Sequence, residues 1–390
     1  MLKISKTLSR TFKNFVRAEQ VSGLLLLACV VFSLVVSNSA LGTGYLRFWH
    51  TPLGFLTLEQ WINDALMAVF FLLIGLELER ELYVGELADL KNALLPILAA
   101  IGGMLVPALL HFSLNGGSAT QSGFGIPMAT DIAFALGVLA LLGKRVPAAL
   151  KVFVVAFAVI DDLGAILVIA SFYTAKLALP YLLAALGVWA LLLVLNRFLR
   201  VQSLALYLLG GALLWGLMLK SGLHATIAGV MLAFAVPFSA QDDEKSPSHK
   251  LEHGLHKPVA FFILPLFALA NTGVVLDAHW AQSLLDANSL GILAGLVLGK
   301  PLGVVLFCWA ACATGLCRLP ESLTWSHIIG AGLLGGIGFT MSIFITNLAF
   351  ADAAPALNAS KIAILLASLL AGLLGFLWLK FLVGGEKTHE

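Results

Sequence analysis

Two adjacent aspartates, Asp161 and Asp162, interrupt the apolar stretch AFAVIDDLGAILVIA at residues 156–170. Asp131 and Lys300 lie inside two other long apolar stretches. An ionisable side chain at the centre of a membrane helix costs about 2.5–3.5 kcal/mol on insertion scales. We therefore expect these side chains to face a protein interior or a water-filled cavity, where a partner or a function offsets that cost.

Depth suggests how these charges meet. The two aspartates fall at the midpoint of residues 152–173, and Lys300 falls at the midpoint of residues 290–311. Lys300 is then about 15 Å from either helix end, at about 1.5 Å per residue, too far for its side chain to reach water. It needs a carboxylate as a partner. Because adjacent helical residues do not share a face, one aspartate can meet Lys300 while the other faces a cavity, and the residues alone leave open which does which.

Three carboxylates against one lysine leave an excess of acid near one plane. Carboxylate oxygens suit hard cations, and the same oxygens bind protons. A cation and a proton would therefore compete for one site, and exchange follows if the empty, charged site cannot change the side to which it is exposed. The alternative is a buried ion-pair network that only specifies helix packing. No Walker-type or kinase-type phosphate loop supports an ATP-driven pump.

The elements that must position these residues are membrane helices. The chain has 390 residues, of which 60% are hydrophobic and 11% charged, whereas a soluble chain has about 25% charged residues. Its net charge of +2 gives no reason to expect nucleic acid as a partner. We predict an all-α polytopic membrane protein that forms a single transporter domain over residues 1–390.

Twelve apolar segments are long enough to cross about 30 Å of hydrocarbon. They cover residues 14–36, 58–80, 94–113, 124–142, 150–173, 179–198, 203–219, 222–238, 254–276, 289–312, 326–349 and 358–382. With the N-terminus inside, 18 of the 23 Lys and Arg residues fall in inside segments and four fall outside. This asymmetry predicts that both termini are cytoplasmic. The basic start of the chain could mimic a signal peptide, but we interpret the apolar run after it as the first span.

Helix-breaking residues gather in the fourth and eleventh spans. Gly125 and Pro127 lie in GIPMATD, and Gly335, Gly336 and Gly338 lie in GAGLLGGIGFTMS. Transporters often use interrupted helices whose ends face a site at the midplane, so we predict an interruption in both spans. Close helix packing is the alternative explanation for the glycines.

Interrupted helices would present charged ends to the side chains nearby. Asp131 could either ligate a cation or offset the positive end of a half-helix. Lys300 could likewise offset a negative end.

Acids and histidines gather at the inner ends of two spans, in GLELERELYVGEL and LEHGLHKP. The group consists of Glu77, Arg80, Glu81, Glu252, His253 and His256. Histidine titrates near pKa 6.5, so such a group could sense internal pH. The residues alone favour an ordinary solvated helix end.

The longest outer loop, residues 37–57, contains aromatic residues and a Pro-Leu-Gly turn signal. It could form a short β-hairpin on the membrane surface. The residues alone favour an irregular loop with interfacial aromatic side chains.

An ordered set of motifs resembles one known family. The set comprises MATDIAFALGVLALLG, VIDDLGAILVIA, SGLHATIAGV, LEH, ILPLFALAN, LGKPLG and GGIGFTMSIFI. Together these motifs resemble the bacterial NhaA-type sodium/proton antiporters, from the first span to about residue 383. No single motif would suffice, whereas the ordered set is specific.

The resemblance implies electrogenic exchange, in which more H⁺ enters than Na⁺ or Li⁺ leaves, with no cofactor. It implies that Asp161 and Asp162 hold the Na⁺ or Li⁺ ion and the proton, and that Lys300 pairs with Asp161. Thr130 and Asp131 would lie at the crossing of the interrupted fourth and eleventh spans, in a fold built from inverted repeats.

At the membrane edges, the resemblance assigns the six inner residues to a pH-response region. It also assigns the loop near residues 45–58 to a dimer-forming hairpin, which implies a homodimer among the lipids of the bacterial inner membrane. Glu79 departs from the family, because a basic residue is expected there. This departure puts the electrostatics and the active pH range of the pH-response region in doubt.

Other functions fit the residues less well. A sodium-coupled transporter of organic solutes could share the architecture, but an acidic site disfavours an anionic substrate. An intramembrane aspartyl protease needs its two aspartates on separate helices. A cation channel would be poorly lined by a buried lysine. We therefore predict a pH-regulated Na⁺(Li⁺)/H⁺ antiporter with alternating access and no enzymatic activity.

Overall fold

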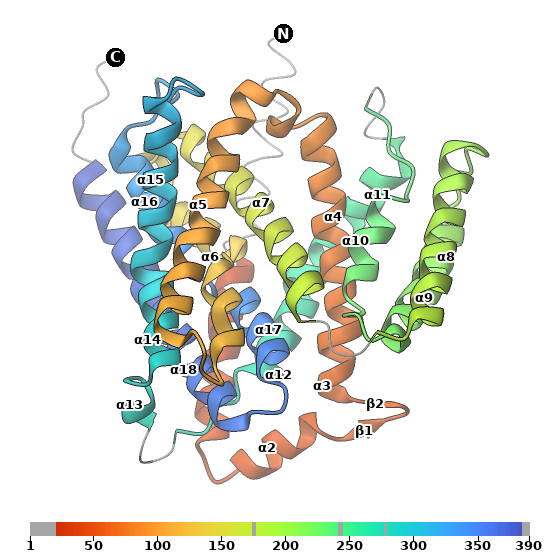
Figure 1. The fold of residues 1–390 in the computed structure, drawn as a ribbon, viewed down its shortest axis with the longest axis horizontal. Helices are drawn as coiled ribbons and strands as arrows, with labels where there is room; N and C mark the ends of the chain where they lie inside the picture. Colours follow the sequence, from red (N-terminus) through yellow and green to blue (C-terminus); the bar gives the residue numbers. More distant parts are fainter. Residues whose placement is uncertain (1–20, 174–176, 241–244, 277, 279, 384–390) are drawn as a thin grey trace. The chain divides into compact units, whose positions relative to one another are not determined.

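The computed structural model describes residues 21–173, 177–240, 245–276, 278 and 280–383, most of which are helical (Figure 1). The chain forms two compact units, each assembled from separate segments. Unit 1 comprises Met1–Leu34, Leu90–Ala165 and Val274–Glu390, and unit 2 comprises Val35–Asp89 and Ile166–Gly273. The single transporter domain over residues 1–390 stays a prediction.

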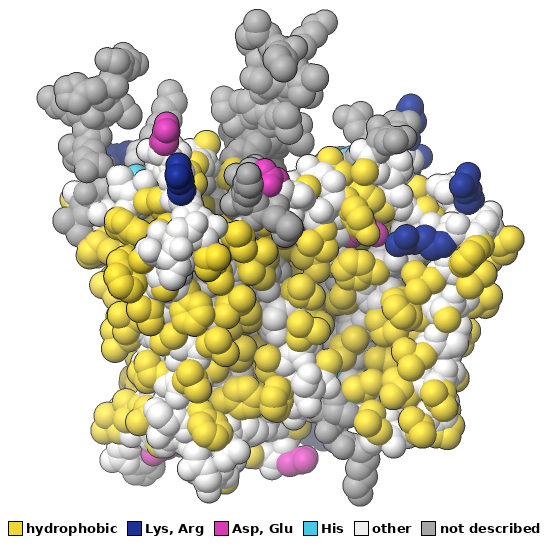
Figure 2. Space-filling view, turned by 45° about the horizontal axis from the view of Figure 1, so that its top comes forward, with side chains coloured by type: hydrophobic (Ala, Val, Ile, Leu, Met, Phe, Trp, Pro, Cys, Tyr) yellow, Lys and Arg dark blue, Asp and Glu magenta, His cyan; other side chains and the backbone are white. Residues whose placement is uncertain are grey.

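The composition of the helices identifies a multi-pass membrane protein. Among the described residues, nine helices are long and apolar enough to cross a membrane, or up to eleven if each of two bent pairs is one span. The bent pairs are Val21–Ser37 with Gly42–Trp49 and Trp325–Gly335 with Phe339–Ala349. On the face in Figure 2, hydrophobic side chains cover the middle, while charged side chains lie toward the margins. Such a surface suits the hydrocarbon of a bilayer.

The predicted count of twelve spans is not confirmed. The eighth predicted span, residues 222–238, contains only the seven-residue helix α10 (Ile227–Ala233). Gly222 caps the preceding helix in the left-handed conformation, with φ of 84°, which ends the helix there. The predicted start of the first span at residue 14 and both chain termini lie outside the described residues.

Unit 1 packs its helices around an apolar core that α5, α6, α7, α15 and α16 share. Its elements are the helix Val21–Ser37 up to Leu34, α5 (Leu90–Asn115), η3 (Gln121–Met128), α6 (Ile132–Leu142), η4 (Gly143–Arg145), α7 (Ala148–Phe172) up to Ala165, α13 (Trp280–Ser283), α14 (Ala287–Ala294), η7 (Gly295–Gly299), α15 (Lys300–Ala313), α16 (Trp325–Gly335), α17 (Phe339–Ala349), α18 (Ala354–Trp378) and η8 (Leu379–Val383). A Cβ atom on Gly303 would lie 2.1 Å from the carbonyl oxygen of Gly102. The backbones of α5 and α15 therefore cross where no side chain fits.

Unit 2 holds the remaining elements. They are α2 (Gly42–Trp49), β1 (Pro52–Leu53), β2 (Leu56–Thr57), α3 (Leu58–Gln60), η1 (Trp61–Leu66), α4 (Met67–Tyr83), η2 (Glu86–Ala88), α8 (Leu179–Arg197), α9 (Leu204–Ser221), α10, α11 (Pro247–Pro258), η6 (Val259–Ile263) and α12 (Leu264–Asn271). α8 and α9 lie side by side (Figure 1). They expose large apolar side chains such as Leu191 and Leu209, as expected of helices that face lipid.

The loop at residues 37–57 is ordered, so the irregular loop that the residues alone favour is wrong. It contains α2 and a two-stranded antiparallel hairpin in which Pro52 pairs with Thr57 and Leu53 pairs with Leu56. Gly54 in the turn has a positive φ of 71°, a conformation that glycine adopts without steric cost. The indole nitrogen of Trp61 donates to the carbonyl oxygen of Leu53 at 2.9 Å and ties the hairpin to the following helix.

Candidate functional site

A buried ion pair lies at the centre of unit 1. Asp161 and Asp162 are buried on α7, and Lys300 is fully buried at the start of α15. Lys300 Nζ donates to Asp161 Oδ2 at 2.6 Å, and it also donates to the carbonyl oxygen of Met128. The structure therefore pairs Lys300 with Asp161, the choice that the residues alone leave open.

The aspartate pair carries more charge than Lys300 offsets. Asp161 Oδ1 is buried and accepts no hydrogen bond from the part of the chain that the structure describes. Asp162 is close enough to contribute to the electrostatic field at Lys300. The Phe157 ring lies 5.6 Å from Lys300 Nζ, within the range of a cation–π contact. One lysine thus faces two buried carboxylates.

Two interrupted helices meet beside this pair, as the glycine and proline pattern predicts. η3 ends at Met128 and α6 begins at Ile132, with extended backbone at Ala129. α16 ends at Gly335 and α17 begins at Phe339, and the two are bent by 44°.

Three glycines of the eleventh predicted span form the break between α16 and α17. Gly335 is the last residue of α16, Gly336 caps it, and Gly338 caps the start of α17. A Cβ atom on Gly336 would lie 2.2 Å from the carbonyl oxygen of Leu296. The break can therefore lie against η7 only if this residue has no side chain.

Asp131 binds the N-terminal ends of two half-helices. Its Oδ1 accepts from the amide of Phe134 at 3.1 Å at the start of α6. Its Oδ2 accepts from the amide of Thr340 at 3.1 Å and from the Thr340 hydroxyl at 2.5 Å at the start of α17. Helix N-termini carry partial positive charge. Of the two roles left open for Asp131, the geometry therefore favours the offset of positive helix ends.

The opposite helix ends are met by hydrogen-bond donors. The Thr130 hydroxyl donates to the carbonyl oxygen of Gly335 at 2.8 Å, at the C-terminal end of α16. The same threonine is close enough to the Asp161 carboxylate to interact with it electrostatically. Lys300 meets the last carbonyl group of η3, that of Met128. The crossing therefore holds two N-terminal helix ends that Asp131 caps, one C-terminal end that meets the charge of Lys300, and one C-terminal end that accepts from the neutral hydroxyl of Thr130.

The charged residues of LEHGLHKP and GLELERELYVGEL meet within unit 2. Arg80 Nε lies 3.0 Å from Glu252 Oε1, and Arg80 Nη2 lies 3.3 Å from Glu81 Oε1. His256 Nε2 lies 3.2 Å from Glu77 Oε1. Glu252 is buried. This is a partly buried ion-pair network, and the solvated helix end that the residues alone favour is wrong.

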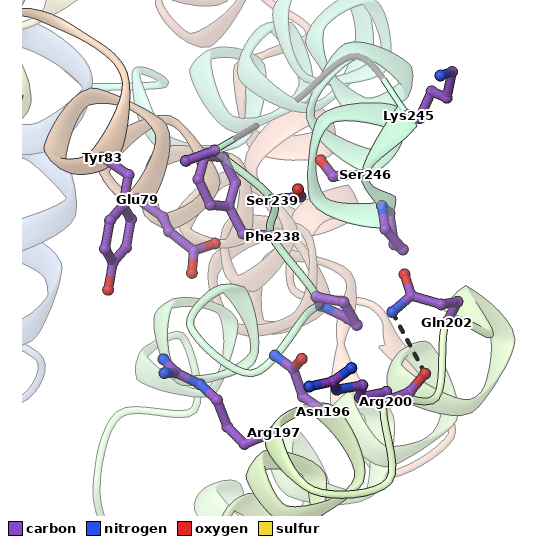
Figure 3. A pocket seen from close by; sticks show the side chains of 13 residues that line it. Glu79, Tyr83, Asn196, Arg197, Arg200, Gln202, Phe238, Ser239, Lys245 and Ser246 are labelled. Carbon is purple, nitrogen blue, oxygen red and sulfur yellow. Dashed lines mark hydrogen bonds between the residues drawn. The ribbon is translucent and has the colours of Figure 1, made fainter. Parts of the chain in front are cut away.

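His253, a member of the predicted inner group, and Glu79, the residue that departs from the family, form no ion pair with that network among the described residues. His253 is exposed and stacks on the ring of His249, with ring centroids 6.3 Å apart. Glu79 is buried and accepts a hydrogen bond from the Ser248 hydroxyl at 3.4 Å. Its carboxylate points into a pocket of about 690 Å³ that Arg197 and Arg200 also line (Figure 3). The unexpected acid therefore sits opposite arginines.

Sequence reasoning missed several contacts. Thr340 lies two residues after Gly338, the last glycine of the run, so its place at a helix start was a usable signal. A second network was missed entirely: His111 Nε2 lies 3.1 Å from Asn288 Oδ1, and Asn288 Nδ2 donates to Ser360 Oγ at 2.8 Å. It joins α5, α14 and α18, and no motif predicts it, because the three residues are far apart in sequence and none lies in a distinctive pattern.

Comparisons with known proteins identify the family of this chain. A family profile described as Na⁺/H⁺ antiporter 1 matches residues 13–379. The Na⁺/H⁺ antiporter NhaA of Dechloromonas aromatica is 67% identical over 375 residues, which cover 96% of each chain. The Na⁺/H⁺ antiporter NhaA 1 of Flavobacterium johnsoniae is 56% identical over 381 residues, 98% of this chain and 99% of the relative. The Helicobacter pylori NhaA (strain HPAG1) is 47% identical and covers 97% of each chain. The chain therefore belongs to the Na⁺/H⁺ antiporter 1 family.

Proposed function

We propose that the protein exports Na⁺ in exchange for H⁺, and that the two ions compete for Asp161 and Asp162. The observation that carries this proposal is the single charge of Lys300 beside two buried carboxylates. A cation or a proton can supply the missing positive charge, and hard cations prefer oxygen ligands of this kind. The names of the relatives, which are Na⁺/H⁺ antiporters, support the same exchange.

The exchange follows from which ion occupies the carboxylates. At low internal pH the aspartates are protonated, and Na⁺ is excluded. At higher pH they release protons, Lys300 gives up its contact with Asp161, and Na⁺ or Li⁺ binds to both aspartates. Without a bound ion, the site carries too much negative charge to change from facing one side of the membrane to facing the other. Each change of side therefore carries a bound ion. A rigid-body movement then exposes the loaded site to the other side of the membrane.

The charge balance supports electrogenic exchange. Two carboxylates and one lysine can together bind and release more than one proton for each monovalent cation. More H⁺ would then enter than Na⁺ or Li⁺ leaves, and the membrane potential would drive export. Thr130 and Asp131 hold the crossing in shape, and Thr130 lies near enough to Asp161 to contribute to the cation site.

The ion-pair network of unit 2 is our candidate for regulation by internal pH. Its carboxylates, Arg80 and His256 are closely coupled, so a proton gained by one group changes the charge balance of the others. His253 stands beside this network on the same helix. Glu79 places an additional acid within the same region, where it lines the same pocket as Arg197, and it is our candidate for a shift of the active pH range.

The finer topology is also part of the proposal. We propose twelve spans in inverted repeats, with both termini in the cytoplasm of a bacterium and the chain in its inner membrane. The nine long helices, the two bent pairs and the short α10 together allow this count. The hairpin of β1 and β2 is the proposed contact of a homodimer, since an exposed strand edge can pair with a second copy.

Proteoliposomes with an imposed pH gradient and an enclosed pH-sensitive dye test this function. Added Na⁺ or Li⁺ should dissipate the gradient, and K⁺ at equal concentration should not. If neither Na⁺ nor Li⁺ changed the dye signal in vesicles proven tight to protons, the proposal would be wrong. Na⁺ uptake that depends on an organic solute and moves no protons would instead support a sodium-coupled solute transporter on the same architecture.

A further inference from the structure

Three side chains that can ligate metals converge within unit 2, outside the aspartate site. They are Glu77 on α4, and Glu252 and His256 on α11. Each offers one donor atom, and the three donor atoms all lie within 4.8 Å of one another. His256 Nε2 is already 3.2 Å from Glu77 Oε1.

Two packed helices, α4 and α11, position these three side chains. Glu252 and His256 are four residues apart, so they project from the same face of α11. α4 packs against α11 in unit 2 and supplies Glu77 from the facing side. The exposed fractions of the three side chains are 14% for Glu77, 8% for Glu252 and 27% for His256. The donor atoms are therefore shielded, while the histidine edge leaves a path for an ion to enter.

The local charge favours a divalent cation. Three carboxylates, those of Glu77, Glu81 and Glu252, surround the single guanidinium of Arg80. With neutral His256, two negative charges remain uncompensated by that arginine. Arg80 Nε occupies Glu252 Oε1 at 3.0 Å, so a metal ion would compete with Arg80 for this carboxylate.

We propose that Glu77, Glu252 and His256 form a binding site for a divalent transition-metal ion, with Zn²⁺ as the representative. One imidazole nitrogen and two carboxylates suit Zn²⁺, whereas Mg²⁺ and Ca²⁺ prefer oxygen ligands alone. Zn²⁺ bonds of about 2.0–2.2 Å require donor atoms roughly 3.3 Å apart, which small side-chain rotations provide here. A water molecule would complete the tetrahedron, and the bound ion would clamp α4 to α11.

Isothermal titration calorimetry of Zn²⁺ binding tests the site. The titration uses the purified full-length protein after removal of any affinity tag. The wild type should bind one Zn²⁺ per chain, and excess Mg²⁺ should not compete. His256→Gln and Glu252→Gln should each weaken binding at least about tenfold, the scale of losing a ligand or its support. His253→Gln, on the exposed face of the same helix, should leave the affinity unchanged.

A variant that should bind Zn²⁺ more tightly distinguishes loss of the site from misfolding. Arg80→Gln removes the competing cation, so it should bind Zn²⁺ more tightly than the wild type, which a damaged protein would not do. The proposal is wrong if the wild type binds no Zn²⁺, if His256→Gln binds as tightly as the wild type, if His253→Gln weakens binding equally, or if Arg80→Gln fails to tighten it. None of these readouts requires transport, so the result is independent of the proposed exchange.

Discussion

Both units bury charged side chains, but they neutralise them differently. In unit 1, Lys300 and Asp161 are fully buried and contact each other and a helix end. In unit 2, Arg80 is shared between Glu81 and Glu252, and its own side chain is 34% exposed. Water and several partners can absorb a lost charge in the second case. In the first case a lost charge must be replaced by another ion, which is the property that an exchanger needs.

We expect the largest loss of stability when the buried ion pair of unit 1 is broken. Lys300→Met leaves the Asp161 carboxylate buried without its cation, so the free energy of unfolding should fall by about 3–5 kcal/mol. Thermal unfolding of the purified variants in detergent measures this. Addition of Asp161→Asn to Lys300→Met should recover much of the loss. The matched control is Lys220→Met, which removes a lysine that lies over the Tyr181 ring in unit 2 and should cost less than about 1 kcal/mol. Equal losses at both lysines would contradict the comparison.

The next effect concerns the helix ends beside that pair. Asp131→Ala removes the acceptor for the first amides of α6 and α17, so stability should fall by about 2–3 kcal/mol through the lost cap and charged hydrogen bonds. Thr340→Val removes one of these bonds and should cost about 1 kcal/mol. The same unfolding assay ranks the two variants. If Thr340→Val were the more damaging substitution, Asp131 would not be the residue that holds the crossing together.

A smaller effect tests the packing that permits the crossing. In Gly336→Ala the new Cβ atom meets the carbonyl oxygen of Leu296, so the backbone must shift at a cost of about 1–2 kcal/mol. Gly137→Ala on α6 has open space around its Cβ position and should be neutral or stabilising by up to about 1 kcal/mol. The two melting temperatures should therefore move in opposite directions, or only the first should move. A stable Gly336→Ala protein with unaltered exchange would show that the break tolerates a side chain.

The smallest effect on stability is expected in unit 2. Arg80→Gln should cost less than about 1 kcal/mol, because partly exposed ion pairs contribute little. Its effect should appear in the pH profile of exchange instead. Loss of this positive charge favours protons on the neighbouring acids, so the onset of activity should move to higher pH. Dye assays at stepped internal pH measure the onset, with Arg47→Gln on α2 as the control. If Arg80→Gln lost much stability and its onset of exchange stayed at the same pH, the two units would not differ in how they neutralise buried charge.

Much of the site could be predicted because charge in an apolar segment is conspicuous. The positions of Asp161, Asp162 and Lys300 at the middle of their spans predict that they lie near one plane. The glycines around Gly336 predict the helix break. The partner of Lys300 could not be derived, because adjacent residues point in different directions and only the packing of α7 against α15 selects one. The contact between Asp131 and Thr340 depends on two segments more than 200 residues apart in sequence, so no local pattern encodes it.

The helices could be predicted from long apolar segments. The prediction was wrong where such a segment forms only a short helix, and where a loop forms a hairpin. Long apolar runs predict α5, α7 and α8 to within a few residues. The run at residues 222–238 is also largely apolar, yet Gly222 and the turn after it leave only α10 helical. The hairpin at Pro52–Thr57 is only four paired residues long, too short for an alternating pattern to distinguish it from an irregular loop.

Proton release on Na⁺ binding tests most directly whether Na⁺ and protons compete for the aspartate pair. Titration of Na⁺ into the detergent-solubilised protein, by calorimetry in buffers of different ionisation enthalpy, counts the protons released per bound ion. We expect proton release in the wild type and in His253→Gln, and neither Na⁺ binding nor proton release in Asp162→Asn. Na⁺ binding without proton release, or unchanged release in Asp162→Asn, would contradict this competition.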